Sequence, residues 1–278
     1  MSWGKSWPAP AKLNLMLRVV GRRADGYHLL QTVFQFVDIA DQLRFRLRDD
    51  GVISRVPVLE GVPEEHDLSV RAARLLRSEA GISAGADIEL TKNLPMGAGL
   101  GGGSSDAATT LLALNQLWGA GMTTEMLAEM GLRLGADVPV FIHGIAAWAE
   151  GVGERLEPVD LTETWYLILF PACHVPTGGI FSAPELTRDS ARITIADFFA
   201  GSRDNDCLPV VCSRYPEVAK TIDWLGNYAE ARLTGTGAAV FATFDSRDDA
   251  QQVLAQLPKY LRGTVARGLN RSPVMEML

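Results

Sequence analysis

The chain is organised around the stretch PMGAGLGGGSSDAA, which occupies residues 95–108. It lies between an alternating apolar and polar run at residues 87–92, typical of a strand, and a run at residues 107–118 with leucines at helical spacing. Glycine loses more backbone entropy on folding than any other residue, so glycines gather where the backbone needs positive φ or a ligand comes close. Amide groups at a helix N-terminus after such a loop bind phosphate. We therefore predict a phosphate-binding loop, followed by a helix.

The start of this helix and the type of loop can also be predicted. We expect Ser104 and Ser105 to supply capping hydroxyls and Asp106 to lie in the first turn, where the helix dipole favours negative charge. Residues 97–102 match the dinucleotide fingerprint G-x-G-x-x-G, but they do not follow a first strand and lack the acidic residue expected about twenty positions later. The Gly-Lys-Ser/Thr of a Walker A loop is missing. A flexible linker is the remaining alternative, but linkers rarely lead directly into an apolar helix.

Composition narrows the function classes. The 278 residues carry a formal net charge of −7, and no basic run is longer than Arg22-Arg23, so we expect neither nucleic acid nor a membrane as a partner. Cys173, Cys207 and Cys212 are odd in number and lack metal-ligand spacing, which indicates reduced thiols and no metal ligands. The first residues form no apolar signal core, and no apolar run is long enough to span a membrane. We therefore expect a cytoplasmic protein.

Residues 12–20 alternate between apolar and polar or long side chains, which predicts a strand with one buried face. Lys12 and Asn14 share its second face. From the pattern alone, a solvated surface lysine is the more common role for Lys12. The prolines at positions 8 and 10 place it at a strand entrance, where it can also reach a cleft.

The turn-rich segment at residues 21–28 ends in Tyr27 and His28, which can stack on and hydrogen-bond a base or a sugar. Packing of the loop by these two rings explains the pattern equally well. We expect two strands to follow, at residues 30–39 and 42–48, joined by a turn at Ala40-Asp41.

Helix signals then recur along the chain. Asp67 and Thr123 are expected to cap helices over residues 67–80 and 124–134, and Asp137 to begin a helix before Pro139. The second half shows strands at 165–170, within 232–244 and at 264–269, and helices at 207–212, at 217–228 and from Ser246 to 257. A loop that contains Thr177 leads to Phe181. Strands and helices interleave without strict βα alternation, so we predict an α+β fold in two domains, residues 1–155 and 156–278.

Three segments resemble, in order, the three motifs of the GHMP kinases (galactose, homoserine, mevalonate and phosphomevalonate kinases): residues 10–15, 95–108 and 233–238. The resemblance implies the two-domain GHMP kinase fold, with an N-terminal ATP-binding domain and a ligand cleft between the domains. Residues 21–28, 134–141 and 205–207 are similar to the branch that phosphorylates a cytidine-diphosphate-linked polyol in isoprenoid precursor synthesis. It therefore implies ATP-dependent transfer to an alcohol group of this small-molecule substrate.

The resemblance also implies roles for individual residues. Asp137 would take the proton from the attacking hydroxyl, and Lys12 would orient Asp137 and stabilise charge. The substrate would be bound by Asn14, Tyr27, His28, Asp137, Thr177 and Phe181. The nucleotide would be bound by Lys92, Pro95, Met96, Gly97, Ala98, Gly99, Leu100, Gly101, Gly102, Gly103, Ser104 and Ser105, with the N–H groups of residues 101–105 directed at developing charge. Mg²⁺ would be carried on the ATP phosphates, since the sequence shows no carboxylate cage.

One departure and two alternatives remain. The family commonly has Asn where this chain has Asp67, and a carboxylate cannot donate a hydrogen bond to adenine, so a backbone group or Lys92 is the better candidate for that contact. Another GHMP kinase, acting on a sugar, homoserine or a mevalonate derivative, is the first alternative, which Tyr27, His28 and Phe181 disfavour. A catalytically dead ligand sensor is the second, which Lys12 and Asp137 disfavour.

Overall fold

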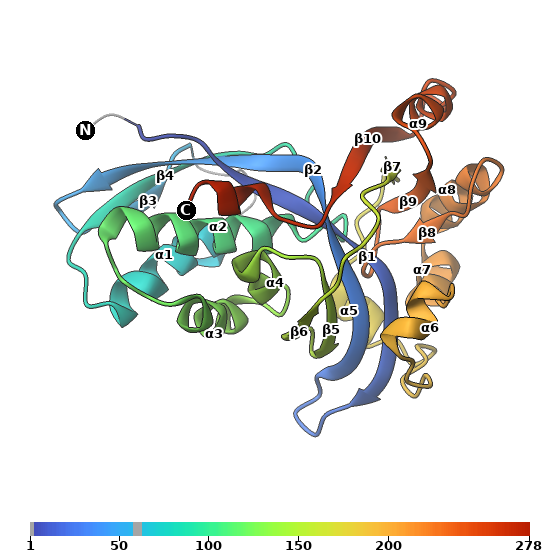
Figure 1. Cartoon of the computed structure of the whole chain (residues 1–278), viewed down its shortest axis with the longest axis horizontal. Coiled ribbons are helices and arrows are strands. Elements are labelled where there is room, and N and C mark those ends of the chain that lie inside the picture. The colour runs from blue at the N-terminus through green and yellow to red at the C-terminus, as the bar shows by residue number, and fades with distance from the viewer. Residues whose placement is uncertain (1–2, 58–62) are drawn as a thin grey trace.

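The computed structural model describes residues 3–57 and 63–278. Within them, ten strands form one sheet in the order β3-β4-β2-β10-β7-β9-β8, with β1 and β5 paired to β2 and β6 paired to β5. The long strands β1 (Trp7–Arg22) and β2 (His28–Arg48) run antiparallel through the middle of the molecule and connect its two halves (Figure 1). Every later element is therefore positioned relative to this strand pair.

The first half of the chain places helices against one face of the sheet (Figure 1). The short strands are β3 (Ile53–Arg55), β4 (Gly85–Thr91), β5 (Ala147–Gly151) and β6 (Arg155–Pro158), and η1 spans Glu64–His66. The helices are α1 (Leu68–Glu79), α2 (Gly102–Trp118), α3 (Thr124–Leu134) and α4 (Val138–His143). Buried apolar side chains from all four helices form one core with β2 and β4. The helix α2 lies in this core, with most of its residues buried.

The second half adds the remaining sheet and five helices. Its strands are β7 (Trp165–Phe170), β8 (Arg232–Leu233), β9 (Val240–Phe244) and β10 (Arg262–Leu269), and its helices are α5 (Thr177–Phe181), α6 (Ile195–Phe199), α7 (Leu208–Arg214), α8 (Pro216–Gly226) and α9 (Arg247–Leu254). They enclose a second core, and a third cluster joins β1 and β2 to β7 and β9. The final segment η2 (Pro273–Glu276) returns to the first core through Val274. The boundary near residue 155 stays a prediction.

Three predicted helix starts are confirmed, each at a residue whose side chain caps the helix. Asp67, Thr123 and Ser246 each accept hydrogen bonds from backbone N–H groups in the first turn of α1, α3 and α9. Asp137 immediately precedes α4, as expected, but its side chain makes no capping hydrogen bond. Its carboxylate is therefore available for other contacts.

The expected start of α2 is wrong. The helix begins at Gly102, and the capping residue is Gly101, whose φ of 72° lies in the left-handed region. Ser104 and Ser105 are therefore inside the helix, and Asp106 lies beyond its first turn. A side-chain cap is unnecessary because the glycine turn itself directs the chain into the helix. The first amides of α2 consequently remain without a capping side chain.

Two predictions about the long strands are also wrong. No turn divides β2 at Ala40-Asp41. Instead, Pro10 of β1 pairs with Ala40 and Ala11 pairs with Val37, so β2 bulges between these positions. The bulge interrupts the alternation in the sequence, which resembles the end of a strand. In addition, β1 is buried on both faces, because the glycine loop covers the face that carries Lys12.

Among the described residues, six short elements were not predicted: β3, β6, α5, α6 and the 3₁₀ helices η1 and η2. The helix α5 occupies the segment predicted to be a loop between Thr177 and Phe181. Pro176 and two glycines dominate its local sequence, and both residue types are typical of turns. Contacts from elsewhere in the chain hold this short helix, as described below.

Candidate active site

A cleft of about 920 Å³ lies between the glycine loop, the middle of β1 and β2, and α5. Nearly all the predicted site residues line it: Lys12, Asn14, Tyr27, His28, Lys92, Asp137, Thr177, Phe181 and residues 95–104. Ser105 is not among the lining residues, because its side chain is fully buried. The structure therefore brings together residues from both halves of the chain.

Lys12 lies at the centre of this cleft. Its Nζ is 3.2 Å from Oδ2 of Asp137, and it donates hydrogen bonds to Oδ1 of Asn14 at 2.5 Å and to the carbonyl of Gly99 at 3.2 Å. Lys12 is only 2% exposed, whereas the Asp137 side chain is 35% exposed. A buried ammonium group requires such partners because its desolvation is costly. Lys12 is thus held in place, while the carboxylate of Asp137 is open to a ligand.

Asn14 links this pair to the third sequence motif. Its side-chain amide donates to the hydroxyl of Thr32 at 2.9 Å, and its backbone N–H donates to the hydroxyl of Thr234 at 3.0 Å. The Thr234 hydroxyl in turn donates to the carbonyl of Gly99 at 3.3 Å. Residues 234–237 form a turn between β8 and β9, closed by a hydrogen bond from the N–H of Gly237 to the carbonyl of Thr234 at 2.9 Å. In the structure this turn supports the glycine loop, and Gly235 lines the cleft.

Two glycines of the loop allow this close approach. At Gly99, with φ of +76°, an added Cβ would lie 2.4 Å from the carbonyl oxygen of Thr234. At Gly101, with φ of +72°, it would lie 2.8 Å from the ring of Phe141 and 3.0 Å from Cε of Lys12. The glycines at these positions are therefore required both by backbone conformation and by neighbouring protein atoms.

The helix α2, which follows the glycine loop, begins with backbone N–H groups that are free to donate to a ligand in the cleft. The backbone N–H of Ser105 donates to the carbonyl of Gly101 at 2.8 Å, so it is not available to a phosphate. This corrects the expectation that all amides of residues 101–105 face the ligand. The amides of residues 102–104 precede the first helical hydrogen bond and have no intrahelical acceptor. Free amides at a helix N-terminus are the type of donor that binds anions in other proteins.

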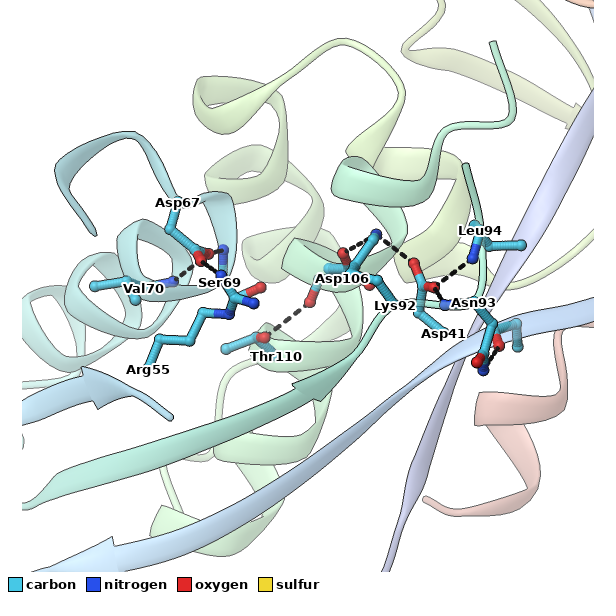
Figure 2. Close-up of polar contacts among 11 residues, drawn as sticks. Asp41, Arg55, Asp67, Ser69, Val70, Lys92, Asn93, Leu94, Asp106 and Thr110 are labelled. Atoms are coloured by element: carbon cyan, nitrogen blue, oxygen red, sulfur yellow. Dashed lines mark hydrogen bonds and ion pairs between the residues drawn. The ribbon is translucent and has the colours of Figure 1, made fainter. Parts of the chain in front are cut away.

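Lys92 belongs to a buried ionic network beside the loop (Figure 2). Its Nζ donates to Oδ2 of Asp41 and, at 2.8 Å, to Oδ2 of Asp106. Asp41 also accepts the backbone N–H groups of Asn93 at 2.6 Å and Leu94 at 2.8 Å. These contacts fix the chain just before the glycine loop. A contact between Lys92 and the nucleotide stays a prediction, and its ammonium group already serves two carboxylates.

Two groups of this network, Asp106 and Lys92, have shifted pKa values. Burial, followed by the negative charge of Asp41, raises the pKa of Asp106 to about 7, although Lys92 opposes the shift. Burial lowers the pKa of Lys92, but the attraction of Asp106 and Asp41 outweighs it and the pKa is raised. The Asp106 carboxyl therefore keeps its proton to a higher pH than an exposed aspartate does.

Asp67 has a structural partner of its own (Figure 2). Its Oδ1 accepts the backbone N–H groups of Ser69 and Val70, and its Oδ2 accepts Nη1 of Arg55 at 3.0 Å. Both side chains of the Arg55–Asp67 pair are buried. Asp67 therefore joins α1 to β3 and, as a carboxylate, offers adenine no donor.

The other end of the cleft carries aromatic rings. His28 and Phe181 stack with their ring centroids 5.1 Å apart and an interplanar angle of 28°, whereas Tyr27 is 60% exposed. The hydroxyl of Thr177 lies 3.1 Å from that of Thr236. Burial lowers the pKa of His28, and nearby arginines lower it further, so its imidazole is neutral at pH 7. Sandwiching of a base between Tyr27 and Phe181 stays a prediction.

Sequence reasoning missed three residues of the site: Asp41, Asp106 in its pairing role, and Arg188. Asp41 offered one signal, a charged residue inside an otherwise apolar stretch, which was interpreted as a turn. Arg188 offered none, because its partner His28 is 160 positions away. The described residues also contain no helix long and apolar enough to cross a membrane.

Comparison with known proteins places this geometry in a family. Residues 67–145 match the model of the GHMP kinases N terminal domain, and residues 191–263 match that of the GHMP kinases C terminal. The chain is 56% identical to the 4-diphosphocytidyl-2-C-methyl-D-erythritol kinase of Nitrosococcus oceani, covering 98% of this chain and 97% of that protein. It is 57% identical to the same kinase of Methylococcus capsulatus, covering 98% of this chain and 94% of that protein.

Solved structures give the same result. A crystal structure of 4-(cytidine 5'-diphospho)-2C-methyl-D-erythritol kinase matches with a TM-score of 0.81 and 32% identity, covering 95% of this chain and 99% of that chain. A mevalonate kinase matches with a TM-score of 0.69 at 13% identity, covering 96% of this chain and 100% of that chain, which shows the shared fold alone. The chain therefore belongs to the GHMP kinases and, within them, to the family of the 4-diphosphocytidyl-2-C-methyl-D-erythritol kinases.

Proposed function

We propose that this chain transfers the γ-phosphoryl group of ATP to the 2-hydroxyl of 4-diphosphocytidyl-2-C-methyl-D-erythritol, a step of the non-mevalonate isoprenoid precursor pathway. The observation that carries the proposal is the Lys12–Asp137 pair, 3.2 Å apart, where the glycine loop meets the cleft. The relatives named above support the choice of substrate. The alternatives, another GHMP kinase or a catalytically dead sensor, are outcomes of the test below.

The proton leaves through Asp137. As the substrate hydroxyl oxygen attacks the γ-phosphorus, the bond from that phosphorus to the bridging oxygen of ADP breaks, and the hydroxyl proton passes to the carboxylate of Asp137. Lys12 holds Oδ2 of Asp137 and places a positive charge beside the reacting groups. Asn14, fixed by Lys12 and Thr32, stands next to the hydroxyl that reacts.

The glycine loop and the N-terminus of α2 hold the phosphates. The free amides of residues 102–104 point donors at the negative oxygens without needing to reorganise during the reaction. The helix dipole adds to this attraction within the first turn. Because phosphoryl transfer depends mainly on positioning and charge stabilisation, these donors supply much of what the reaction needs.

The donor atoms around this cleft fit Mg²⁺, which prefers oxygen and binds through one or two carboxylates plus substrate phosphates. Among residues 3–57 and 63–278, no group of three or more His, Cys, Asp or Glu side chains is arranged to hold a metal ion. The hydroxyl of Ser104, which lines the cleft at the start of α2, is the side chain that would add a protein oxygen to the shell of a phosphate-bound ion. Bound Mg²⁺ supplies neutralisation of the phosphate charge.

The cytidine end of the substrate would lie at the aromatic end of the cleft. Phe181 and Tyr27 offer flat faces for the pyrimidine, and His28 offers a hydrogen bond to its edge. Thr177, which begins α5 and lines the cleft, would contact the diphosphate between the two ends. In this arrangement the pyrimidine and the reacting hydroxyl of the substrate would bind at different ends of the cleft, the hydroxyl beside Asp137.

A single assay tests the proposal: ATP consumption by the purified protein with the cytidine-linked polyol, homoserine or mevalonate as the acceptor. We expect turnover with the first and little with the other two. Turnover with homoserine or mevalonate alone would identify a different GHMP kinase. Tight binding of the cytidine compound without turnover would identify a sensor. Asp137→Asn serves as the inactive control in each case.

A further inference from the structure

Arg188 lies behind the aromatic end of the cleft, in the segment between α5 and α6, and does not line the cleft itself. Its Nη2 donates to the carbonyls of Phe181 at 3.0 Å and Ala183 at 2.6 Å. Its Nη1 donates to the carbonyl of Leu186 at 2.9 Å, and its Nε donates to Nε2 of His28 at 3.2 Å. One guanidinium group thus joins His28 to the chain that carries its stacking partner.

The carbonyl contacts hold α5 in place. A helix of five residues has too few internal hydrogen bonds to be stable alone, and its last carbonyls have no intrahelical donor. Arg188 satisfies the carbonyl of Phe181, the last residue of α5, and that of Ala183 just beyond it. The position of the Phe181 ring therefore depends on Arg188.

The contact with His28 determines where the imidazole carries its proton. A guanidinium group can only donate, so Nε2 of His28 must accept and is unprotonated. A neutral imidazole has one N–H, which is then on Nδ1. Among the residues that the structure describes, Nδ1 has no hydrogen-bond partner, and the imidazole lines the cleft. His28 therefore presents a fixed donor to a ligand.

The surrounding charges keep the imidazole in this neutral form. Burial is the main cause that lowers the pKa of His28, and the positive charges of Arg188 and Arg22 lower it further. Arg22 lies opposite His28 in the pairing of β1 with β2. Asp25, in the adjoining loop, pairs instead with Arg23.

A fixed Nδ1–H donor distinguishes the two common pyrimidines. The N3 of cytosine is an acceptor and matches this donor. The N3 of uracil carries a hydrogen, so the same geometry would set two donors against each other. Stacking on Phe181 cannot make this distinction, because every base has a π-face. Discrimination between the two bases therefore depends on which nitrogen of His28 carries the proton. It also depends on the unfavourable donor–donor contact that uracil would make.

We propose that Arg188 is a positioning residue that sets substrate specificity: it holds His28 as the Nδ1–H tautomer and fixes α5, so that the cleft selects cytosine over uracil. This proposal rests on the proposed function. Arg188 acts through His28 and Phe181 and does not touch the substrate.

The test combines a spectroscopic and a kinetic measurement on Arg188→Met. In the free wild-type protein, ¹⁵N NMR should show His28 with a protonated Nδ1 and an unprotonated Nε2. The signal is assigned with His28→Gln, since the chain has four histidines. In Arg188→Met we expect a mixture of tautomers. We also expect KM for the cytidine substrate to rise roughly tenfold and the preference over the uridine analogue to fall roughly tenfold, the equivalent of one hydrogen bond.

Two further variants isolate the cause. Arg192→Met removes an equal charge four residues away, where Arg192 pairs with Glu150, and should leave the tautomer and the preference unchanged. Arg188→Lys keeps the charge but lacks the planar fork, so His28 should stay neutral while the preference for cytidine falls as it does in Arg188→Met. This variant also serves if Arg188→Met does not fold.

The outcomes separate the two proposals. If the wild type shows no turnover of the cytidine substrate, the proposed function fails. If the wild type is active but Arg188→Met retains both the Nδ1–H tautomer and the full preference for cytidine, the role assigned to Arg188 is wrong. If Arg192→Met lost the Nδ1–H tautomer and the preference for cytidine to the same extent as Arg188→Met, the role assigned to Arg188 would also be wrong, because the effect would be one of charge in general.

Discussion

Replacement of Gly101 by alanine tests how the glycine loop and Lys12 depend on each other. The residue has φ of +72°, a conformation that costs an L-residue about 1–2 kcal/mol. The new Cβ would lie 2.8 Å from the Phe141 ring and 3.0 Å from Cε of Lys12. Overpacking of this kind typically costs about 1–3 kcal/mol. Together these terms predict a loss of about 2–5 kcal/mol in the free energy of unfolding.

The matched control is Gly102→Ala, one residue later. Gly102 is the first residue of α2, its φ is not in the left-handed region, and the nearest atom to an added Cβ is Nζ of Lys92 at 3.4 Å. Alanine is favoured over glycine in a helix by up to about 1 kcal/mol, so the stability of this variant should change little. The two variants differ in position by one residue but in expected stability by several kcal/mol.

Thermal unfolding of the two variants measures this difference. For a protein of this size we expect Tm of Gly101→Ala to fall by about 5–15 °C, and that of Gly102→Ala to stay within about 3 °C of the wild type. Displacement of Lys12 should also lower kcat of Gly101→Ala at least roughly tenfold. Equal Tm values for the two variants would refute the reasoning, because the loop would then have room for a side chain at Gly101.

Three further predictions concern catalysis, recognition and pH. Asp137→Asn should lower kcat by roughly 10²–10⁴-fold with little change in KM. The loss of kcat in the double variant of Asp137→Asn and Lys12→Met should be smaller than the two single losses combined, because the two residues act as a unit. If steady-state kinetics showed that Asp137→Asn kept most of its kcat, the assignment of Asp137 as the base would be wrong. Phe181→Ala should raise KM for the cytidine substrate roughly ten- to a hundredfold, the loss of one stack, and His28→Ala should narrow the preference over the uridine analogue. KM for ATP should not move in either variant, and a change in ATP affinity alone would place the Phe181 ring at the adenine site. The pKa of Asp106 is raised from 3.8 to about 7, so the folded state binds its proton more tightly than the unfolded state and stability should fall as pH rises from about 4 to about 7. Urea unfolding across this range should show a flatter profile for Asp106→Asn, and an unchanged profile would assign the pH dependence to other groups.

Local patterns in the sequence determined the elements whose cause is local. The caps at Asp67, Thr123 and Ser246 were predictable because a side chain and the amides it binds lie within one helical turn. The glycine loop was predictable as the connection between a strand and a helix for the same reason, since the glycines, the preceding strand and the following helix are contiguous. The family resemblance also depends on such contiguous motifs.

Only the tertiary structure decided which distant residues meet. Lys12 is followed by 124 residues before Asp137, and nothing in the alternation of β1 indicates that the glycine loop will bury it. The same holds for Asp41 and Lys92, which were assigned to separate elements but share one buried network.

Burial and pairing at long range also changed the meaning of individual residues. Asp41 was interpreted as part of a turn, but the partly buried ammonium group of Lys92, just after β4, compensates its charge. Arg188 was not distinguishable from a surface arginine, because its role depends on His28 from another part of the chain. Sequence periodicity reports which face of an element is apolar, whereas the partner of a buried charge is set by how the two halves of the chain pack around β1 and β2.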